Sequence, residues 1–354
     1  MKNKSHTLKI VFTVLIIVFL LLIGTKKIKS HRSGQNPGSM TFSLLIMDTY
    51  ARITAVGLNE VQQSECAAAV DSKLRELETK FSYYLPESEL SRINSTAGTI
   101  DMHLSDEMFA VIYESIKMCR LTDGAFDVTI ASIEDLWKQA HISGVKPAAD
   151  KIAAARELTG CGALVLDPEN KTLKFAAEGV KIDLGGIAKG YAIDQVYNIL
   201  RRFGASGGII DIGGDMRLFG RSELGKKWLV GIQDPQFAFE NGPASVPETL
   251  KRLELSDVAV ATSGHYRRFT TFGDERMSHI IDPRLAAGSD KTASVTILAA
   301  SAMQADALAT AVSVMGAEKG LDFVNSLDGV EAVIIENNSA DILYSRGAKQ
   351  FITD

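Results

Sequence analysis

The sequence is poor in the residues and patterns that identify common metal and nucleic-acid sites. Only three of its 354 residues are cysteine, and Cys66, Cys119 and Cys161 stand apart without zinc-binding Cys/His spacing. We interpret them as buried thiols, and the pattern leaves one disulfide open. The 38 basic and 43 acidic residues form no basic stripe in the body of the chain. A nucleic-acid partner is therefore not expected.

Several catalytic motifs are also absent. The chain has no HExxH zinc motif, no GxSxG nucleophile elbow and no EF-hand loop, which excludes the enzymes and calcium sensors that carry them. It also lacks the G-x-G-x-x-G fingerprint of dinucleotide-binding folds. Hydrophobic residues make up 46% of the sequence, which is enough for a substantial core.

Long apolar runs are scarce, and one stands out near the N-terminus. Residues 10–24 carry no charge and are flanked by lysines on both sides. Neither a small-x-small cleavage pattern nor a lipid-attachment cysteine follows directly. We expect a basic tail at 1–9, an uncleaved signal-anchor at 10–24, a polar linker at 25–42 and one folded domain at 43–354 outside the cytoplasm. A cleaved signal peptide is the alternative for this segment.

Hydrophobic periodicity predicts strands in groups, separated by a few long helices. The expected strands are a pair within 41–57 and single strands at 163–167, 172–177 and 180–184. The expected helices cover 60–82, 105–124, 187–204 and 301–327, the last interrupted at Gly316. This arrangement favours an α+β fold over a regular doubly wound sheet.

The stretch "DLGGIAKG" at 183–190 misses the Walker A pattern, because a tyrosine and an alanine follow where Lys and Ser/Thr are required. Gly185 and Gly186 would let the backbone approach a ligand closely. A helix beginning near Ile187 would aim unpaired N–H groups at an anion, with Lys189 in its first turn. A structural turn and a phosphate site are both compatible with these residues.

A second stretch, "ADALATA" at 305–311, places Asp306 and Thr310 on one face of a predicted helix. That face is otherwise largely apolar, and burial of an unpaired carboxylate there would be unfavourable. A hard cation such as Mg²⁺, held by the carboxylate, the hydroxyl and backbone carbonyls, would relieve this cost. An aspartate satisfied by an arginine or a backbone amide is the simpler alternative.

Three further stretches contain polar residues beside turn signals. His279 lies in "SHIIDPR" at 278–284, where an imidazole with a pKa near neutrality could accept a proton from a hydroxyl nucleophile. A compact turn at 262–264 is expected to bind an anion or to border a strand. The block "IIDIGGD" at 209–215 ends an apolar strand at two glycines, where the backbone can approach a ligand.

The order of these blocks is more informative than each block alone. They are "MDT" at 47–49, "FSYYLPESELSRIN" at 81–94, "TDGAFDVTI" at 122–130, "KIDLGGIAKGYAID" at 181–194, "IIDIGGD", "VGIQDP" at 230–235, "ATSGHYRRF" at 261–269, "SHIIDP" and "ADALATA". Together they resemble the ApbE family of FAD:protein FMN transferases, from about residue 43 to the C-terminus. The resemblance implies an ApbE-like α+β fold of mostly antiparallel sheets with packed helices.

The resemblance also implies an activity and a site. Family members use Mg²⁺ and FAD, transfer FMN to a threonine hydroxyl of a target flavoprotein, and release AMP. The implied metal ligands are the side chains of Asp306 and Thr310 and backbone oxygens of Gly186 and Ala309. The implied flavin-nucleotide contacts are Met47, Tyr84, Ala125, Phe126, Asp127, Asp183, Lys189 and Ile280. The implied catalytic residues are His279, as the base, and Lys189.

The sequence also leaves two alternative functions open and predicts where the protein is located. Some relatives carry asparagine at the position of Tyr84 and are associated with FAD hydrolysis, whereas tyrosine favours transfer; Tyr83 fits the same position. The alternatives are an Mg²⁺-dependent FAD pyrophosphatase that yields FMN and AMP, and a non-catalytic FAD carrier. We expect the domain to be anchored at the cell membrane and to face an extracytoplasmic acceptor, such as a subunit of a membrane redox complex.

Overall fold

An eight-stranded antiparallel sheet forms the centre of the structure, a computed structural model that describes residues 38–96, 100–235, 249–264, 269–272, 275–278, 280–337 and 341–353. In spatial order its strands are β1 (Gly38–Ile46), β2 (Thr49–Leu58), β6 (Gly207–Ile212), β7 (Asp215–Phe219), β10 (Val258–Gly264), β15 (Thr292–Ala299), β16 (Glu331–Glu336) and β17 (Ile342–Tyr344). Every neighbouring pair in it is antiparallel. The predicted α+β class with mostly antiparallel sheets is confirmed.

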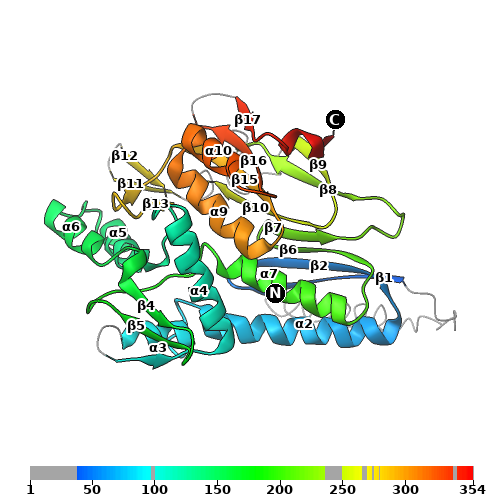
Figure 1. The fold of residues 1–354 in the computed structure, drawn as a ribbon, viewed down its shortest axis with the longest axis horizontal. Coiled ribbons are helices and arrows are strands. Elements are labelled where there is room, and N and C mark those ends of the chain that lie inside the picture. Colours follow the sequence, from blue (N-terminus) through cyan, green and yellow to red (C-terminus); the bar gives the residue numbers. More distant parts are fainter. Residues whose placement is uncertain are drawn as a thin grey trace, which may run out of the picture. The chain divides into compact units, whose positions relative to one another are not determined.

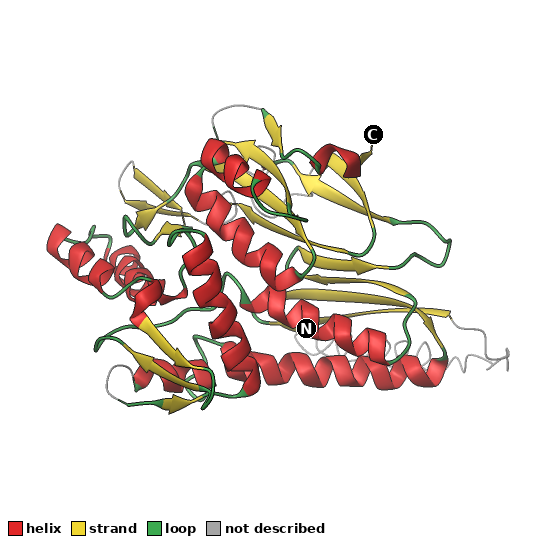
Figure 2. Ribbon diagram, viewed as in Figure 1, coloured by secondary structure: helices red, strands yellow, loops and turns green. Residues whose placement is uncertain are grey.

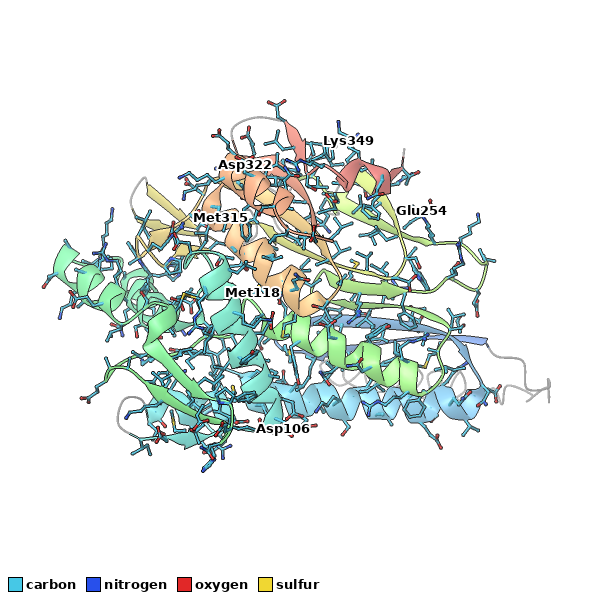
Figure 3. The ribbon with its side chains drawn as sticks, viewed as in Figure 1. Asp106, Met118, Glu254, Met315, Asp322 and Lys349 are labelled. Atoms are coloured by element: carbon cyan, nitrogen blue, oxygen red, sulfur yellow. A yellow bond between two sulfur atoms is a disulfide. The ribbon has the colours of Figure 1, made fainter. Side chains whose placement is uncertain are left out.

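Both faces of this sheet are covered (Figure 1). On one face lie the helices α2 (Glu60–Phe81), α7 (Ala188–Arg202), α9 (Ala302–Met315) and α10 (Ala317–Asn325). On the other face lies a small sheet of β18 (Ile352–Thr353), β9 (Thr249–Leu255) and β8 (Trp228–Gln233). Figure 3 labels Glu254 on β9 and Lys349 on the short helix η4 (Ala348–Phe351), which mark this region. All eight residues of β15 are buried, because Val295 packs toward the helices while Leu298 packs toward the small sheet.

The remaining elements flank the helical face (Figure 2). They are α3 (Glu89–Ser95), β3 (Met102–His103), α4 (Asp106–Leu121), η1 (Val128–Ile130), α5 (Ala131–Ser143), α6 (Ala149–Glu157), η2 (Cys161–Ala163), β4 (Leu164–Asp167), β5 (Thr172–Phe175), β11 (Phe269–Phe272), β12 (Glu275–Ser278), β13 (Ile281–Asp282) and β14 (Ala287–Gly288). Figure 3 labels Asp106 and Met118 near the two ends of α4. The prediction of helices omitted α3, α5 and α6.

The structure resolves the cysteine pairing that the sequence left open. Cys119 at the end of α4 and Cys161 in η2 form a disulfide, with 5.6 Å between their Cα atoms. Cys66 is a buried free thiol on α2, and burial raises its pKa to about 11. The one disulfide that the sequence left open is therefore present, and of the three cysteines Cys66 is the buried free thiol.

The long predicted helices are all confirmed. Ser105 caps α4 by accepting a hydrogen bond from the Met108 N–H at 3.3 Å. The helical stretch at 301–327 divides into α9 and α10 at Gly316, whose φ of +88° suits glycine. The strand pair within 41–57 is confirmed as β1 and β2.

Two local predictions are wrong. Residues 180–184 alternate in the way of a strand, but none of the strands that the structure describes pairs with them. Instead, the Asn94 side chain binds both the N–H and the C=O of Ile182 at 2.8 Å. The turn expected at 262–264 is part of β10, because these residues pair in register with β15 from Thr296 to Ser294.

The membrane prediction concerns a segment outside this description. Residues 10–24 and residues 25–37 of the predicted linker are not among the described residues. The end of the predicted linker, 38–42, is not linker but the first part of β1, because it pairs in register with β2. Within the residues that are described, no helix is long and apolar enough to cross a bilayer.

Candidate functional site

A cleft of about 990 Å³ collects most of the residues that the sequence singled out. It lies where the β1–β2 and β6–β7 turns, α5 and the N-terminal end of α7 meet α9. The predicted residues that line it are Met47, Tyr84, Ala125, Phe126, Asp127, Asp183, Gly186, Lys189, Ile280, Asp306 and Thr310. The remaining two are Ala309, which is buried beside it and whose carbonyl accepts a bond from the Ser313 hydroxyl at 2.9 Å, and His279, which lies outside the described residues.

The glycine bend at 185–186 adjoins α9. A Cβ atom added to Gly186 would lie 3.3 Å from Thr310 Oγ1 and 3.2 Å from the Phe126 ring. The Gly190 N–H donates to Asp306 Oδ2 at 3.0 Å. Residues more than 100 positions apart in the sequence therefore meet at one end of the cleft.

Gly190 has a different purpose from the other two glycines of this stretch. A Cβ there would lie 2.3 Å from the carbonyl oxygen of Ala302 and 2.6 Å from the Cα of Met303. The missing side chain lets α7 and α9 cross closely enough for the Asp306 hydrogen bond to form. This glycine is required for helix packing, whereas Gly186 borders the cleft.

Asp306 is nearly inaccessible, with a side chain only 5% exposed, and it is paired with Lys189. The Lys189 Nζ lies 3.1 Å from Asp306 Oδ1 and also forms an ion pair with Asp215. Burial raises the pKa of the Asp306 carboxyl, an effect that the Lys189 charge opposes. Burial alone would lower the pKa of Lys189, but Asp215 and Asp306 together raise it. Lys189 is therefore a charged partner of both carboxylates.

These contacts bear on two expectations from the sequence. The simpler alternative for Asp306 holds in this structure, since a backbone amide and a lysine satisfy it. The Gly190 N–H and the Lys189 ammonium, which were expected to face an anion, both bind Asp306. The helix predicted to begin near Ile187 is α7, which begins at Ala188. Its N-cap residue Ile187 provides no side-chain hydrogen bond to the first turn.

Acidic side chains line the cleft beside the bend. The Gly185 N–H donates to Asp183 Oδ1 at 2.6 Å, and burial raises the pKa of Asp183. Burial also raises the pKa of Glu134, with further contributions from Asp183 and Asp135. Carboxyls with a raised pKa retain a proton more readily, which lessens their repulsion of an anionic ligand.

Two tyrosines lie at the rim. Tyr84 is 66% exposed, and the Lys138 ammonium lies 4.8 Å from the centre of its ring. The Tyr83 hydroxyl donates to Asp135 at 2.9 Å. Both rings line the cleft, so either can meet a planar ligand there.

The site contains residues that the sequence analysis did not assign. Asp215 follows the two glycines of "IIDIGGD", and this position after a glycine pair is the feature of the sequence that could have indicated a role in the site. The Ser263 hydroxyl lies 3.4 Å from Thr310 Oγ1. Glu134 and His141 also line the cleft, and they were missed because α5 was not predicted.

The residues at the bend suit a hard cation. Among the described residues, no group of three or more His, Cys, Asp or Glu side chains could hold a metal ion. A cation would therefore rely on one carboxylate, Asp306, together with the Thr310 hydroxyl and a backbone carbonyl such as that of Gly186. An all-oxygen set of this kind is what Mg²⁺ prefers.

The chain is similar to known proteins over most of its length. The family model described as "ApbE family" matches residues 47–334. The chain is 33% identical over 307 residues to a FAD:protein FMN transferase of Vibrio cholerae, covering 85% of this chain and 86% of that one. It is 30% identical over 291 residues to one of Haemophilus influenzae, covering 80% and 82%.

Solved structures show the same fold. The ApbE protein of Thermotoga maritima superposes with a TM-score of 0.80 at 29% identity, covering 89% of this chain and 100% of that one. The flavin transferase ApbE of Vibrio cholerae gives a TM-score of 0.77 at 29% identity, covering 89% and 99%.

Proposed function

This chain belongs to the ApbE family, and we propose that it is an Mg²⁺-dependent FAD:protein FMN transferase that acts on a threonine hydroxyl of a target flavoprotein. The observation that carries the proposal is the junction of the glycine bend with α9. There Asp306, Thr310 and Gly186 line one cleft with Lys189. The relatives named as FAD:protein FMN transferases support the reaction class.

The proposed reaction is a phosphoryl transfer. The threonine oxygen forms a bond to the phosphorus of the FMN half of FAD, the bond from that phosphorus to the bridging oxygen breaks, and AMP leaves with the bond's electron pair. Mg²⁺, held by Asp306, Thr310 and backbone oxygens of Gly186 and Ala309, would neutralise charge on the phosphoryl oxygens. Lys189 supplies a second positive charge at the same end of the cleft.

Two further roles follow from the family resemblance. His279 accepts the proton of the threonine hydroxyl. Met47, Tyr84, Ala125, Phe126, Asp127, Asp183 and Ile280 contact the flavin nucleotide. An H279A variant should retain FAD binding and lose transfer, and wild-type turnover would remove the base assignment.

Labelling of an acceptor protein tests the function. The full-length chain in detergent is incubated with FAD, MgCl₂ and a flavoprotein that presents a threonine, and the acceptor is examined for flavin fluorescence after denaturation. A transferase makes the acceptor fluorescent and releases AMP, and a Thr→Val acceptor provides the control. Free FMN and AMP without labelling would indicate a pyrophosphatase, and bound FAD without AMP release would indicate a carrier.

We also propose that residues 10–24 anchor the chain in the cell membrane with the folded domain outside the cytoplasm. The disulfide between Cys119 and Cys161 supports this location, because disulfides persist in oxidising compartments. The acceptor would then be an extracytoplasmic flavoprotein, such as a subunit of a membrane redox complex. Protease added outside spheroplasts of a bacterial host should digest the domain, whereas a protected domain would contradict this orientation.

A further inference from the structure

Asp215 is a buried carboxylate that lines the cleft, and the reaction proposed above gives it no role. Its side chain is 6% exposed, and it begins β7 directly after the glycine turn at 213–214. Asp215 Oδ1 accepts a hydrogen bond from the Thr262 N–H of β10 at 3.1 Å. Its other oxygen pairs with Lys189. The backbone bond fixes the carboxylate and leaves one oxygen directed at the ammonium.

Lys189 therefore stands between two buried carboxylates that differ in what they can do. Asp306 Oδ2 is engaged by the Gly190 backbone N–H, whereas Oδ1 is held by a side chain, that of Lys189, among the residues that the structure describes. A cation that binds at Oδ1 would be repelled by the ammonium 3.1 Å away. For the cation to bind, Lys189 must give up Asp306, and the positive charge of this half-buried side chain, which is 30% exposed, is then better stabilised if a second carboxylate pairs with it.

We propose that Asp215 is a positioning residue that retains Lys189 when a divalent cation takes its place at Asp306. The inference rests on the proposed metal site. Asp215 keeps the ammonium paired and inside the cleft while Asp306 becomes a metal ligand. Without Asp215, Lys189 can pair only with Asp306, and the cation has to compete with it.

Metal binding tests this role without reference to catalysis. MgCl₂ is titrated calorimetrically into the full-length chain in detergent, for the wild type, D215N, K189M and K189M/D215N. D215N keeps an oxygen for the Thr262 N–H, and we expect it to bind Mg²⁺ about tenfold more weakly. D211N provides the matched control, because Asp211 lies on the same hairpin, accepts from the Gly214 N–H at 2.9 Å and does not line the cleft. It should bind Mg²⁺ as the wild type does.

The lysine variants separate positioning from other roles. K189M removes the competitor and should bind Mg²⁺ at least as tightly as the wild type. D215N should then change the affinity by less than about threefold in the K189M background, because its effect acts through Lys189. A tenfold loss in that background would overturn the proposal, since Asp215 would then act on the cation directly. Equal affinities of D215N and the wild type would overturn it as well.

Thermal unfolding establishes that each variant is folded. Should D215N alone be unstable, the comparison of K189M/D215N with K189M still tests the proposal, because a tenfold loss there would show that Asp215 acts on the cation without Lys189 and would overturn it. A wild-type chain that binds no Mg²⁺ would overturn this inference together with the metal site. If the acceptor were labelled in the absence of divalent cations, the transferase function would stand and its proposed dependence on Mg²⁺ would be wrong.

Discussion

At the scale of single residues, Gly190 controls how closely α7 and α9 cross. The carbonyl oxygen of Ala302 and the Cα of Met303 lie where its Cβ would be, and both belong to the backbone. No flexible side chain can yield there, so an added methyl group must push the two helices apart. The Gly190 N–H would then move away from Asp306.

We expect G190A to lower the free energy of unfolding by about 2 kcal/mol or more, because overpacking of a close contact displaces backbone. Chemical denaturation measures this loss. G162A is the matched control, since a Cβ at Gly162 meets nothing within 4 Å, and it should be nearly neutral. A G190A variant as stable as G162A would contradict the close crossing.

Asp306 is the residue on which the metal assignment depends. D306A should remain folded and lose metal-dependent FMN transfer by about 100-fold or more, because the only carboxylate among the proposed metal ligands is removed. The acceptor-labelling assay, run with MgCl₂ and with a chelator, measures this effect. D322N, on the surface of α10, should transfer at the wild-type rate. Undiminished transfer by D306A would remove Asp306 from the metal site.

At the scale of elements, a charged cluster joins α2 to α4. Glu107 of α4 accepts hydrogen bonds from Lys73 and Lys80 of α2 at 2.6 Å and 2.7 Å, and its side chain is 18% exposed. Burial alone would raise the pKa of Glu107, but the two lysines lower it to about 2. The folded state thus favours the ionised form of this carboxyl.

The sign of the pH dependence follows from that shift. The folded pKa lies below the ordinary value near 4.5, so the stabilisation is complete above pH 4.5 and is lost as the pH falls toward 2. At pH 7, E107Q should lose about 1 to 3 kcal/mol of unfolding free energy. The difference from the wild type should shrink between about pH 5 and pH 2.

Urea denaturation across this pH range measures the effect. E114Q provides the control, because Glu114 pairs only within α4, with Lys117 at 2.7 Å, and a pair of that kind contributes about 0.5 kcal/mol. A difference between E107Q and the wild type that stays constant from pH 7 to pH 3 would contradict the assignment of the pKa shift to this cluster.

The segment at 180–184 shows why one element could not be predicted. Val180, Ile182 and Leu184 alternate and are all buried, as in a strand. Local pattern records which side chains are buried, and it contains no information on what binds the backbone. Asn94, 88 residues earlier, supplies the partner for Ile182 that a neighbouring strand would otherwise provide.

At the scale of the whole chain, the disulfide closes a loop between residues 42 positions apart. It ties the end of α4 to η2, across the segment that carries Ala125, Phe126 and Asp127 into the cleft. Reduction should lower the free energy of unfolding by about 2 to 4 kcal/mol, mainly by freeing the unfolded chain.

Thermal unfolding with and without dithiothreitol measures this contribution. The double variant C119S/C161S should match the reduced wild type and should not respond to the reductant. Cys66 does not interfere, because burial keeps its thiol protonated and unreactive. A wild-type chain that is equally stable in both conditions would contradict a stabilising role of the disulfide.

The sequence by itself determined the local features of this protein and the order of its motifs. Caps such as Ser105, the interruption at Gly316 and the bend at 185–186 are set by neighbouring residues, so short windows suffice to predict them. The ordered blocks pointed to the family, and the match over residues 47–334 confirmed it.

Only the tertiary structure decided which charged groups meet. Lys189 lies in the first turn of α7, Asp215 begins β7 and Asp306 lies on α9, and the close crossing at Gly190 brings these distant parts of the sequence together. Burial then makes their pairing obligatory, because an isolated charge is unfavourable in the interior. Sequence patterns extend over a few residues, whereas this pairing depends on contacts across 117 positions.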